Sequence, residues 1–244
     1  LPGFAFSSTF LKILNVKAQN SSHLDVLILG GGPAGFATAI PLAEAGFRVA
    51  LVHRPHHGIR KGEIQTTSGA AFTDVVNIGI GGSDLGPVMA HAALTPYADG
   101  PAVHFVSNID GADIADTLRL LDPKTTLFIV ASKTFTTIET MTNARTAQAW
   151  LNDKGVSSEG RFIALSTNHA KAAEWGIPED RVLGFEDWVG GRYSMWGPIG
   201  LSIMIAIGPE GFRAFLRGAQ EMDRHFCSAD LHENMPVLLA LVGI

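Results

Sequence analysis

The sequence predicts an α/β protein in which a parallel sheet is flanked by helices on both faces. Short apolar runs alternate along the chain with segments of helical periodicity, and this alternation is typical of β-α-β units. The runs are almost wholly apolar, as expected for strands that are covered on both faces. Glycine-rich turns follow two of these runs, at 30–32 and 79–82, and ligands of such sheets bind at strand-to-helix turns.

The predicted elements divide the chain in two. Strands are expected over Val26–Leu29, Val49–Val52, Val75–Ile80, Val103–Val106, Leu127–Ala131 and Phe162–Ser166. Helices are expected over Ala34–Ala45, Ala112–Leu121, Ile138–Asn152, Ala170–Trp175, Ile199–Ile207 and Gly211–Cys227, with a last one from about Asn234. The first two strands and the helix between them form an N-terminal βαβ unit. A polar seam near 53–57 separates a segment over 1–57 from a domain over 58–244.

Composition excludes several classes of protein. A chain of 244 residues is long enough to bury a core without disulfides or a structural metal. The net charge of −5 argues against a broad surface for nucleic acid or anionic membranes. The single cysteine, Cys227, excludes an intrachain disulfide and favours a reducing, cytoplasmic setting. The longest apolar stretch, 195–207, is shorter than the roughly 20 residues that span a bilayer. Histidines 53, 56 and 57 are interpreted as solvated loop residues, so we expect no metal.

A glycine motif follows the first predicted strand. Residues 25–35 contain G-x-G-x-x-G, in which Gly30 allows the tight turn, Gly32 the approach of a pyrophosphate and Gly35 close packing of helix and strand. Residues 24–54 resemble the opening of FAD- or NAD-dependent oxidoreductases. The acidic residue expected at the end of the second strand is replaced by His53-Arg54. Two interpretations stay open: a βαβ turn without ligand, and a dinucleotide site in which Arg54 meets a 2′-phosphate.

A second cluster follows the strand predicted at 127–131. Hydroxyl groups and backbone amides at the start of a helix form a neutral cradle for a phosphate dianion, and one lysine adds charge. An ordinary helix cap explains one or two hydroxyls but not five. The spacing of a Walker loop is absent. The predicted phosphate cradle consists of Ser132, Lys133, Thr134, Thr136, Thr137 and Thr140.

Two further turns carry glycine. Gly81, Gly82 and Ser83 offer a backbone-lined hollow for sugar hydroxyls, although a tight turn with Ser83 as a helix cap explains the same residues. Arg192 follows Gly190-Gly191, and its permanent charge and planar donors suit a developing enediolate oxygen. The alternative for Arg192 is a surface arginine in a loop.

Together these segments resemble the glucose-6-phosphate isomerase family, whose enzymes have the sugar-isomerase (SIS) fold, from about Gly58 to Ile244. The motifs that carry the resemblance are Thr73–Pro87, Ser132–Thr137 and Gly190–Pro198, with a weaker one at Arg60–Ile64. The resemblance implies a Rossmann-like three-layer sandwich. It also implies interconversion of glucose 6-phosphate and fructose 6-phosphate through a cis-enediol in glycolysis and gluconeogenesis, with no cofactor. The full-length enzyme is expected to be a homodimer.

The resemblance also assigns roles to residues and reveals departures. It places the phosphate on Ser132, Lys133, Thr134, Thr137 and Thr140, the sugar on Gly82 and Ser83, Arg192 beside the reacting carbons and Glu139 near the site. The family's catalytic base, and the His and Lys that open the sugar ring, lie beyond the segment that ends here at Ile244. We therefore expect a partial and inactive chain, whose N-terminal segment is a fusion or an artefact. The alternatives are an oxidoreductase fragment and a non-catalytic module that binds sugar phosphates.

Overall fold

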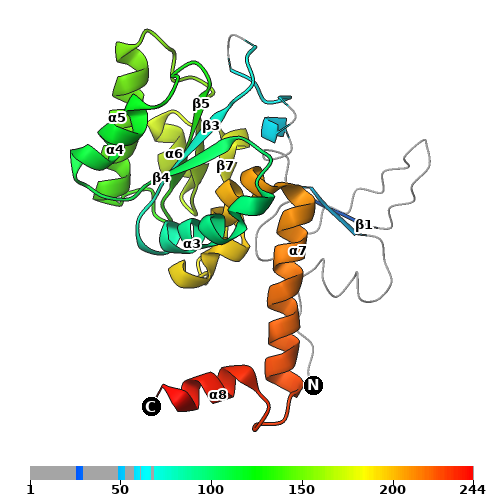
Figure 1. Cartoon of the computed structure of the whole chain (residues 1–244). Coiled ribbons are helices and arrows are strands. Elements are labelled where there is room, and N and C mark those ends of the chain that lie inside the picture. The colour runs from blue at the N-terminus through cyan, green and yellow to red at the C-terminus, as the bar shows by residue number, and fades with distance from the viewer. Residues whose placement is uncertain (1–25, 30–48, 53–57, 61, 67–68, 244) are drawn as a thin grey trace, which may run out of the picture.

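The body of the molecule is a five-stranded sheet in which every neighbouring pair of strands is parallel (Figure 1). The computed structural model describes residues 26–29, 49–52, 58–60, 62–66 and 69–243. The sheet order is β4-β3-β5-β6-β7. The strands are β3 (Asp74–Ile78), β4 (Ala102–Val106), β5 (Thr126–Ala131), β6 (Phe162–Leu165) and β7 (Val182–Leu183). The predicted parallel α/β class is confirmed.

Helices cover both faces of this sheet, because side chains alternate across each strand and both sets are apolar. The helices are α3 (Leu85–Leu94), α4 (Gly111–Arg119), α5 (Ile138–Asp153), α6 (His169–Trp175), α7 (Leu201–Ser228) and α8 (Met235–Val242). Val76 and Phe128 face a core shared with α4, α5 and α6, whereas Val75 and Leu127 face a core that includes the start of α7. Helix α3 packs against α7 on that second side.

One α-helix and one strand of the structure were not predicted from the sequence. Helix α3 carries Gly86 and Pro87 in its first turn, and both residues weaken a helical pattern in sequence. Proline is tolerated there because the first amides of a helix have no partner within the helix. Strand β7 has only two residues, too few to show a period. The strand predicted over 75–80 ends at Ile78, so Gly79 and Ile80 belong to the following turn.

Helix α7 joins the two helices predicted over 199–207 and 211–227. It is broken at Gly208, whose φ of 74° and ψ of 170° are not helical, and Pro209 follows. The guanidinium of Arg60 donates to the carbonyl oxygens of Ile205 at 2.6 Å and Ala206 at 2.9 Å, just before the break.

The span 198–228, which contains α7, is long and apolar enough to cross a membrane. However, 61% of its most apolar 18-residue stretch is buried in the fold, as in a core helix.

The N-terminal strands lie outside the main sheet. Strands β1 (Val26–Leu29) and β2 (Val49–Val52) have the predicted bounds and pair in parallel, with Val26 opposite Val49. Parallel pairing is what a βαβ unit requires. The predicted helix Ala34–Ala45, the glycines at 30, 32 and 35, and the seam at 53–57 lie outside the described residues.

The far half of α7 and helix α8 extend away from the body of the molecule (Figure 1). Asn234 caps α8, with its Oδ1 accepting from the Val237 amide at 3.3 Å and its Nδ2 donating to the Phe226 carbonyl at 2.8 Å. Helix α8 is apolar along its length, and Leu239 and Val242 are 76% and 86% exposed. Its apolar side chains are therefore not part of the core of this chain.

Candidate functional site

The site lies where the strand order reverses. Strand β3 pairs with β4 on one side and with β5 on the other, so the segments that follow β3 and β5 leave the sheet side by side. A crevice forms at the carboxyl ends of strands at such a switch point, and it is the usual ligand site of open α/β sheets. The glycine turn at 79–84 follows β3, and the predicted cradle at 132–140 follows β5. The fold therefore brings two predicted motifs together.

A third predicted motif packs against the glycine turn. The short helical turn Gly191–Trp196 contacts the turn Gly81–Ser83. The two backbones touch, because a Cβ atom on Gly82 would lie 2.3 Å from the carbonyl carbon of Gly191. The buried hydroxyl of Ser194 donates to the carbonyl oxygen of Gly191 at 2.5 Å and lies 3.4 Å from that of Gly82. Only glycine at position 82 allows this approach.

The cradle is joined to that third loop by its lysine. The Lys133 ammonium donates to the backbone carbonyl of Asp187. On the other side, the Lys133 carbonyl accepts from the Ser166 and Thr167 hydroxyls at 2.9 and 2.8 Å and from the Thr167 amide at 3.0 Å. Lys133 is thus fixed by the loops after β6 and β7, and its ammonium group joins the cradle to the segment that leads into the third motif.

The hydroxyl groups of the cradle do not form the side-chain hydrogen bond that usually caps the start of a helix. Thr137 is the N-cap residue of α5, yet its side chain makes no capping bond and instead contacts the Ser132 hydroxyl at 3.1 Å. The Thr134 and Thr136 hydroxyls hydrogen-bond each other at 2.6 Å. The Thr140 hydroxyl is buried in a residue only 2% exposed and has no partner. The free amides at the start of α5 and this unpartnered hydroxyl favour an anion site over an ordinary helix cap.

Two other predicted site residues, Arg192 and Glu139, are less buried than Thr140. Arg192 is exposed, directly after the Gly191 backbone that touches Gly82. Glu139 is half-buried in the first turn of α5. Ser83 is not a helix cap: Asp84 occupies that position, without a side-chain capping bond. The capping alternative for Ser83 is therefore wrong.

Two buried polar residues beneath the glycine turn, Asn77 and Asp84, were not predicted as site residues. Asn77, fully buried at the end of β3, donates from Nδ2 to the Ser83 carbonyl at 3.3 Å. Asp84 is 6% exposed, and its Oδ1 has no partner. Burial raises the pKa of Asp84, a hydrogen bond from Ser107 opposes the rise, and the charge of Asp113 adds to it. Both residues lie in the motif at 73–87, but nothing in their spacing distinguishes them from its other polar residues.

We expect the Asp84→Asn variant to be more stable than the wild type at pH 7. A raised pKa means that the folded chain holds this proton more tightly than the unfolded chain does, so stability is lost as pH rises above 3.8 through the folded-state pKa. The amide cannot ionise, so the gain should disappear below about pH 3.8. Urea unfolding from pH 3 to 8 tests this. Asp153→Asn, at an exposed position, is the control. A gain that does not change with pH would contradict the assignment to Asp84.

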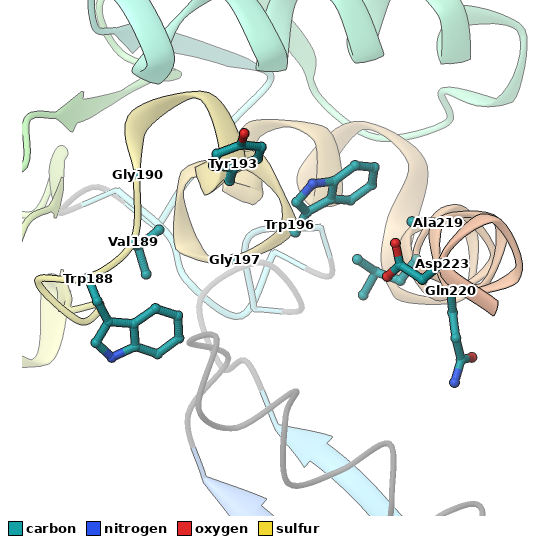
Figure 2. Close-up of a pocket in the computed structure, with 10 residues that line it drawn as sticks. Trp188, Val189, Gly190, Tyr193, Trp196, Gly197, Ala219, Gln220 and Asp223 are labelled. Carbon is teal, nitrogen blue, oxygen red and sulfur yellow. The ribbon is translucent and has the colours of Figure 1, made fainter. Parts of the chain in front are cut away.

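A cavity of ≈ 520 Å³ opens beside the third loop (Figure 2). Trp188 and Trp196 flank it, and Asp223 faces it from α7 (Figure 2). Trp188 is 69% exposed, unlike the other three tryptophans, which pack against the cores. A second cavity, of ≈ 430 Å³, lies between α5 and α6.

Within the described ranges, no three His, Cys, Asp or Glu side chains gather in a way that could hold a metal ion.

The fold and these loops define an α/β protein with a cluster of hydroxyl groups and one lysine at the switch point of a parallel sheet. A family model described as phosphoglucose isomerase matches residues 49–244, and the chain belongs to this family. A second model, described as an FAD binding domain, matches residues 23–68.

Individual relatives agree with this assignment. The glucose-6-phosphate isomerase of Ruegeria pomeroyi is 61% identical over 222 residues, covering 91% of this chain and 41% of the relative. That of Roseobacter denitrificans is 73% identical over 172 residues, 70% of this chain and 32% of the relative. The crystal structure of a glucose-6-phosphate isomerase from Chlamydia trachomatis superposes with a TM-score of 0.64 at 32% identity, covering 86% of this chain and 37% of that one.

The chain spans between 32% and 41% of the length of the curated relatives named here. The alignment with the Ruegeria pomeroyi protein covers 91% of the chain, so it extends into residues 1–57. Residues 49–68 are matched by both family models. The division of the chain at residue 57 therefore stays a prediction.

Proposed function

We propose that the chain supplies the phosphate-binding part of an enzyme that interconverts glucose 6-phosphate and fructose 6-phosphate. The observation that carries the proposal is the meeting of three loops at the switch point, with the Thr140 hydroxyl buried and unpartnered at the start of α5. The relatives named above supply the identity of the sugar.

The proposed mechanism assigns one task to each loop. The amides at the start of α5, with the hydroxyls of Ser132, Thr134, Thr137 and Thr140, bind the phosphate, and Lys133 contributes charge. The Gly82–Ser83 turn accommodates the sugar without side-chain bulk at position 82. The Arg192 guanidinium stabilises negative charge as it develops on the enediolate oxygen. The base that moves the proton, and the groups that open the ring, are assigned to the part of the full-length relatives outside this match. We place the full-length enzyme in the cytoplasm as a homodimer that uses no cofactor.

Removing one cradle hydroxyl should weaken phosphate binding. Hydrogen bonds to charged groups contribute about 1.5–3 kcal/mol, so Thr137→Ala should raise the Kd for glucose 6-phosphate about tenfold or more. The measurement is titration calorimetry on the 244-residue chain. The matched control is Thr146→Ala, whose hydroxyl is exposed on α5 and bonds only to the Thr142 carbonyl, at 3.1 Å. Equal affinities for Thr137→Ala and wild type would place the phosphate elsewhere.

The match of residues 23–68 to an FAD binding domain favours a second candidate, a flavin- or nicotinamide-dependent oxidoreductase. The glycines of its motif lie outside the described residues, so we derive no chemical step from a flavin. The ribose-binding acid of such domains is replaced here by His53-Arg54. We therefore expect the purified protein to be colourless. A stoichiometric flavin absorbance band in the visible range would favour the oxidoreductase instead.

A further inference from the structure

Phe135 has a backbone conformation that an aromatic residue rarely adopts. Its φ is 55°, and it is the one non-glycine residue with positive φ in the part of the chain that the structure describes. Side-chain sterics disfavour this left-handed region for all residues except glycine, and most of all for bulky ones. Such a conformation persists only where the surrounding structure holds it, and it is often found at functional sites.

Two sets of contacts hold Phe135 in place. Its side chain is 4% exposed in the core beneath α5 and α6, and its ring meets the edge of the Trp175 ring with centroids 6.5 Å apart. Its amide donates to the Ser132 carbonyl at 3.1 Å, which closes a turn. The preceding Lys133 carbonyl is fixed by the loop after β6. The turn is thus anchored at its start by hydrogen bonds and at Phe135 by a buried ring.

The conformation at Phe135 determines where its two neighbours lie. In an extended segment, residues two apart are separated by about 6.6 Å along the strand. Here the Thr134 and Thr136 hydroxyls are 2.6 Å apart on exposed residues, while the ring between them is buried. The left-handed turn at Phe135 therefore goes with two exposed hydroxyls held within hydrogen-bond distance of each other, while the side chain between them is buried in the core.

We infer that Phe135 is a positioning residue of the phosphate cradle: its buried ring fixes the left-handed turn that brings the flanking hydroxyls together. The inference rests on the proposed function, because it assumes that the anion binds at 132–140. Phe135 itself touches no substrate in this scheme. Its effect on binding would act through the geometry of Thr134 and Thr136.

The test compares two truncations in the same core. Phe135→Leu keeps an apolar side chain but shortens the anchor, and we expect the Kd for inorganic phosphate to rise about tenfold. Phe162→Leu is the matched control: Phe162 is also 4% exposed and packs on Trp175, with centroids 4.9 Å apart, but it belongs to β6 and not to the loop. Thermal unfolding should show that both variants lose stability, whereas calorimetry should show that only Phe135→Leu loses affinity. An equal affinity loss in both, or in neither, would overturn the inference.

A second pair of variants leaves the loop sequence unchanged, in case Phe135→Leu does not fold. Trp175→Leu removes the ring on which Phe135 rests and should weaken phosphate binding, whereas Trp175→Phe keeps an aromatic edge and should restore it. The amide resonances of residues 134 and 136 should shift in Trp175→Leu and return in Trp175→Phe. Unchanged affinity in Trp175→Leu overturns the inference. A wild-type chain that binds no phosphate overturns the proposed function first, and the two failures are therefore distinguishable.

Discussion

The 244-residue chain is expected to bind glucose 6-phosphate and yet to isomerise it at least about 10²–10⁴-fold more slowly than a full-length relative, which is the typical effect of losing a positioned general base. A base must lie within hydrogen-bond reach of the C2 proton. Among the predicted site residues, Glu139 is the only carboxylate, and it is half-buried on the helix that carries the cradle. Arg192 and the phosphate cradle can stabilise charge, but neither accepts the proton.

A coupled assay of fructose 6-phosphate conversion tests this expectation, with the full-length Ruegeria pomeroyi enzyme as the reference. Calorimetry on the same preparation shows whether the sugar phosphate binds. Binding without turnover is the expected result, and it matches a module that binds sugar phosphates without converting them. Turnover close to that of the reference would mean that this segment contains a base. Glu139→Gln would then be the first variant to assay.

The second large effect is expected at Gly82. In the Gly82→Ala variant, the new methyl group would lie 2.3–2.6 Å from three backbone atoms of Gly191, and backbone cannot move aside as the end of a side chain can. Overpacking of this kind costs about 1–3 kcal/mol. Because the contact also holds the Arg192 loop against the glycine turn, the variant should lose stability and affinity for glucose 6-phosphate together.

Urea unfolding and calorimetry measure the two losses. The control is Gly218→Ala, at a helical position on α7 where an added Cβ meets no atom within 4 Å. That substitution should instead stabilise the chain by about 0.5–1 kcal/mol, because glycine costs more backbone entropy than alanine in a helix. If Gly82→Ala were as stable as wild type, the close approach of the two loops would be wrong.

Several features of the site follow from local sequence. The apolar runs predicted as strands over 127–131 and 162–166 both form buried strands, at 126–131 and 162–165. The hydroxyl-rich stretch at 132–140 stands out because one helix cap does not need so many hydroxyls. The break in α7 was predictable as a gap between two helices, because Gly208-Pro209 interrupts any helical pattern.

Other features depend on residues far apart in the chain. The contact of Gly82 with Gly191 joins segments that no local pattern relates, and the hydrogen bond of Lys133 to the Asp187 carbonyl does the same. The left-handed conformation of Phe135 is opposed by its own side chain, so local preference argues against it. The burial of its ring beside Trp175 reverses that preference.

The sequence by itself determined the class of sheet and the family, and it singled out the hydroxyl-rich stretch at 132–140 as a candidate site, because these depend on apolar periodicity and on clusters of residue types. Only the tertiary structure decided how the three loops meet and which hydroxyls do not cap a helix. It also decided that burial raises the pKa of the Asp84 carboxyl. The physical reason is that backbone approach and burial depend on the packing of distant segments, whereas periodicity and composition are properties of each segment alone.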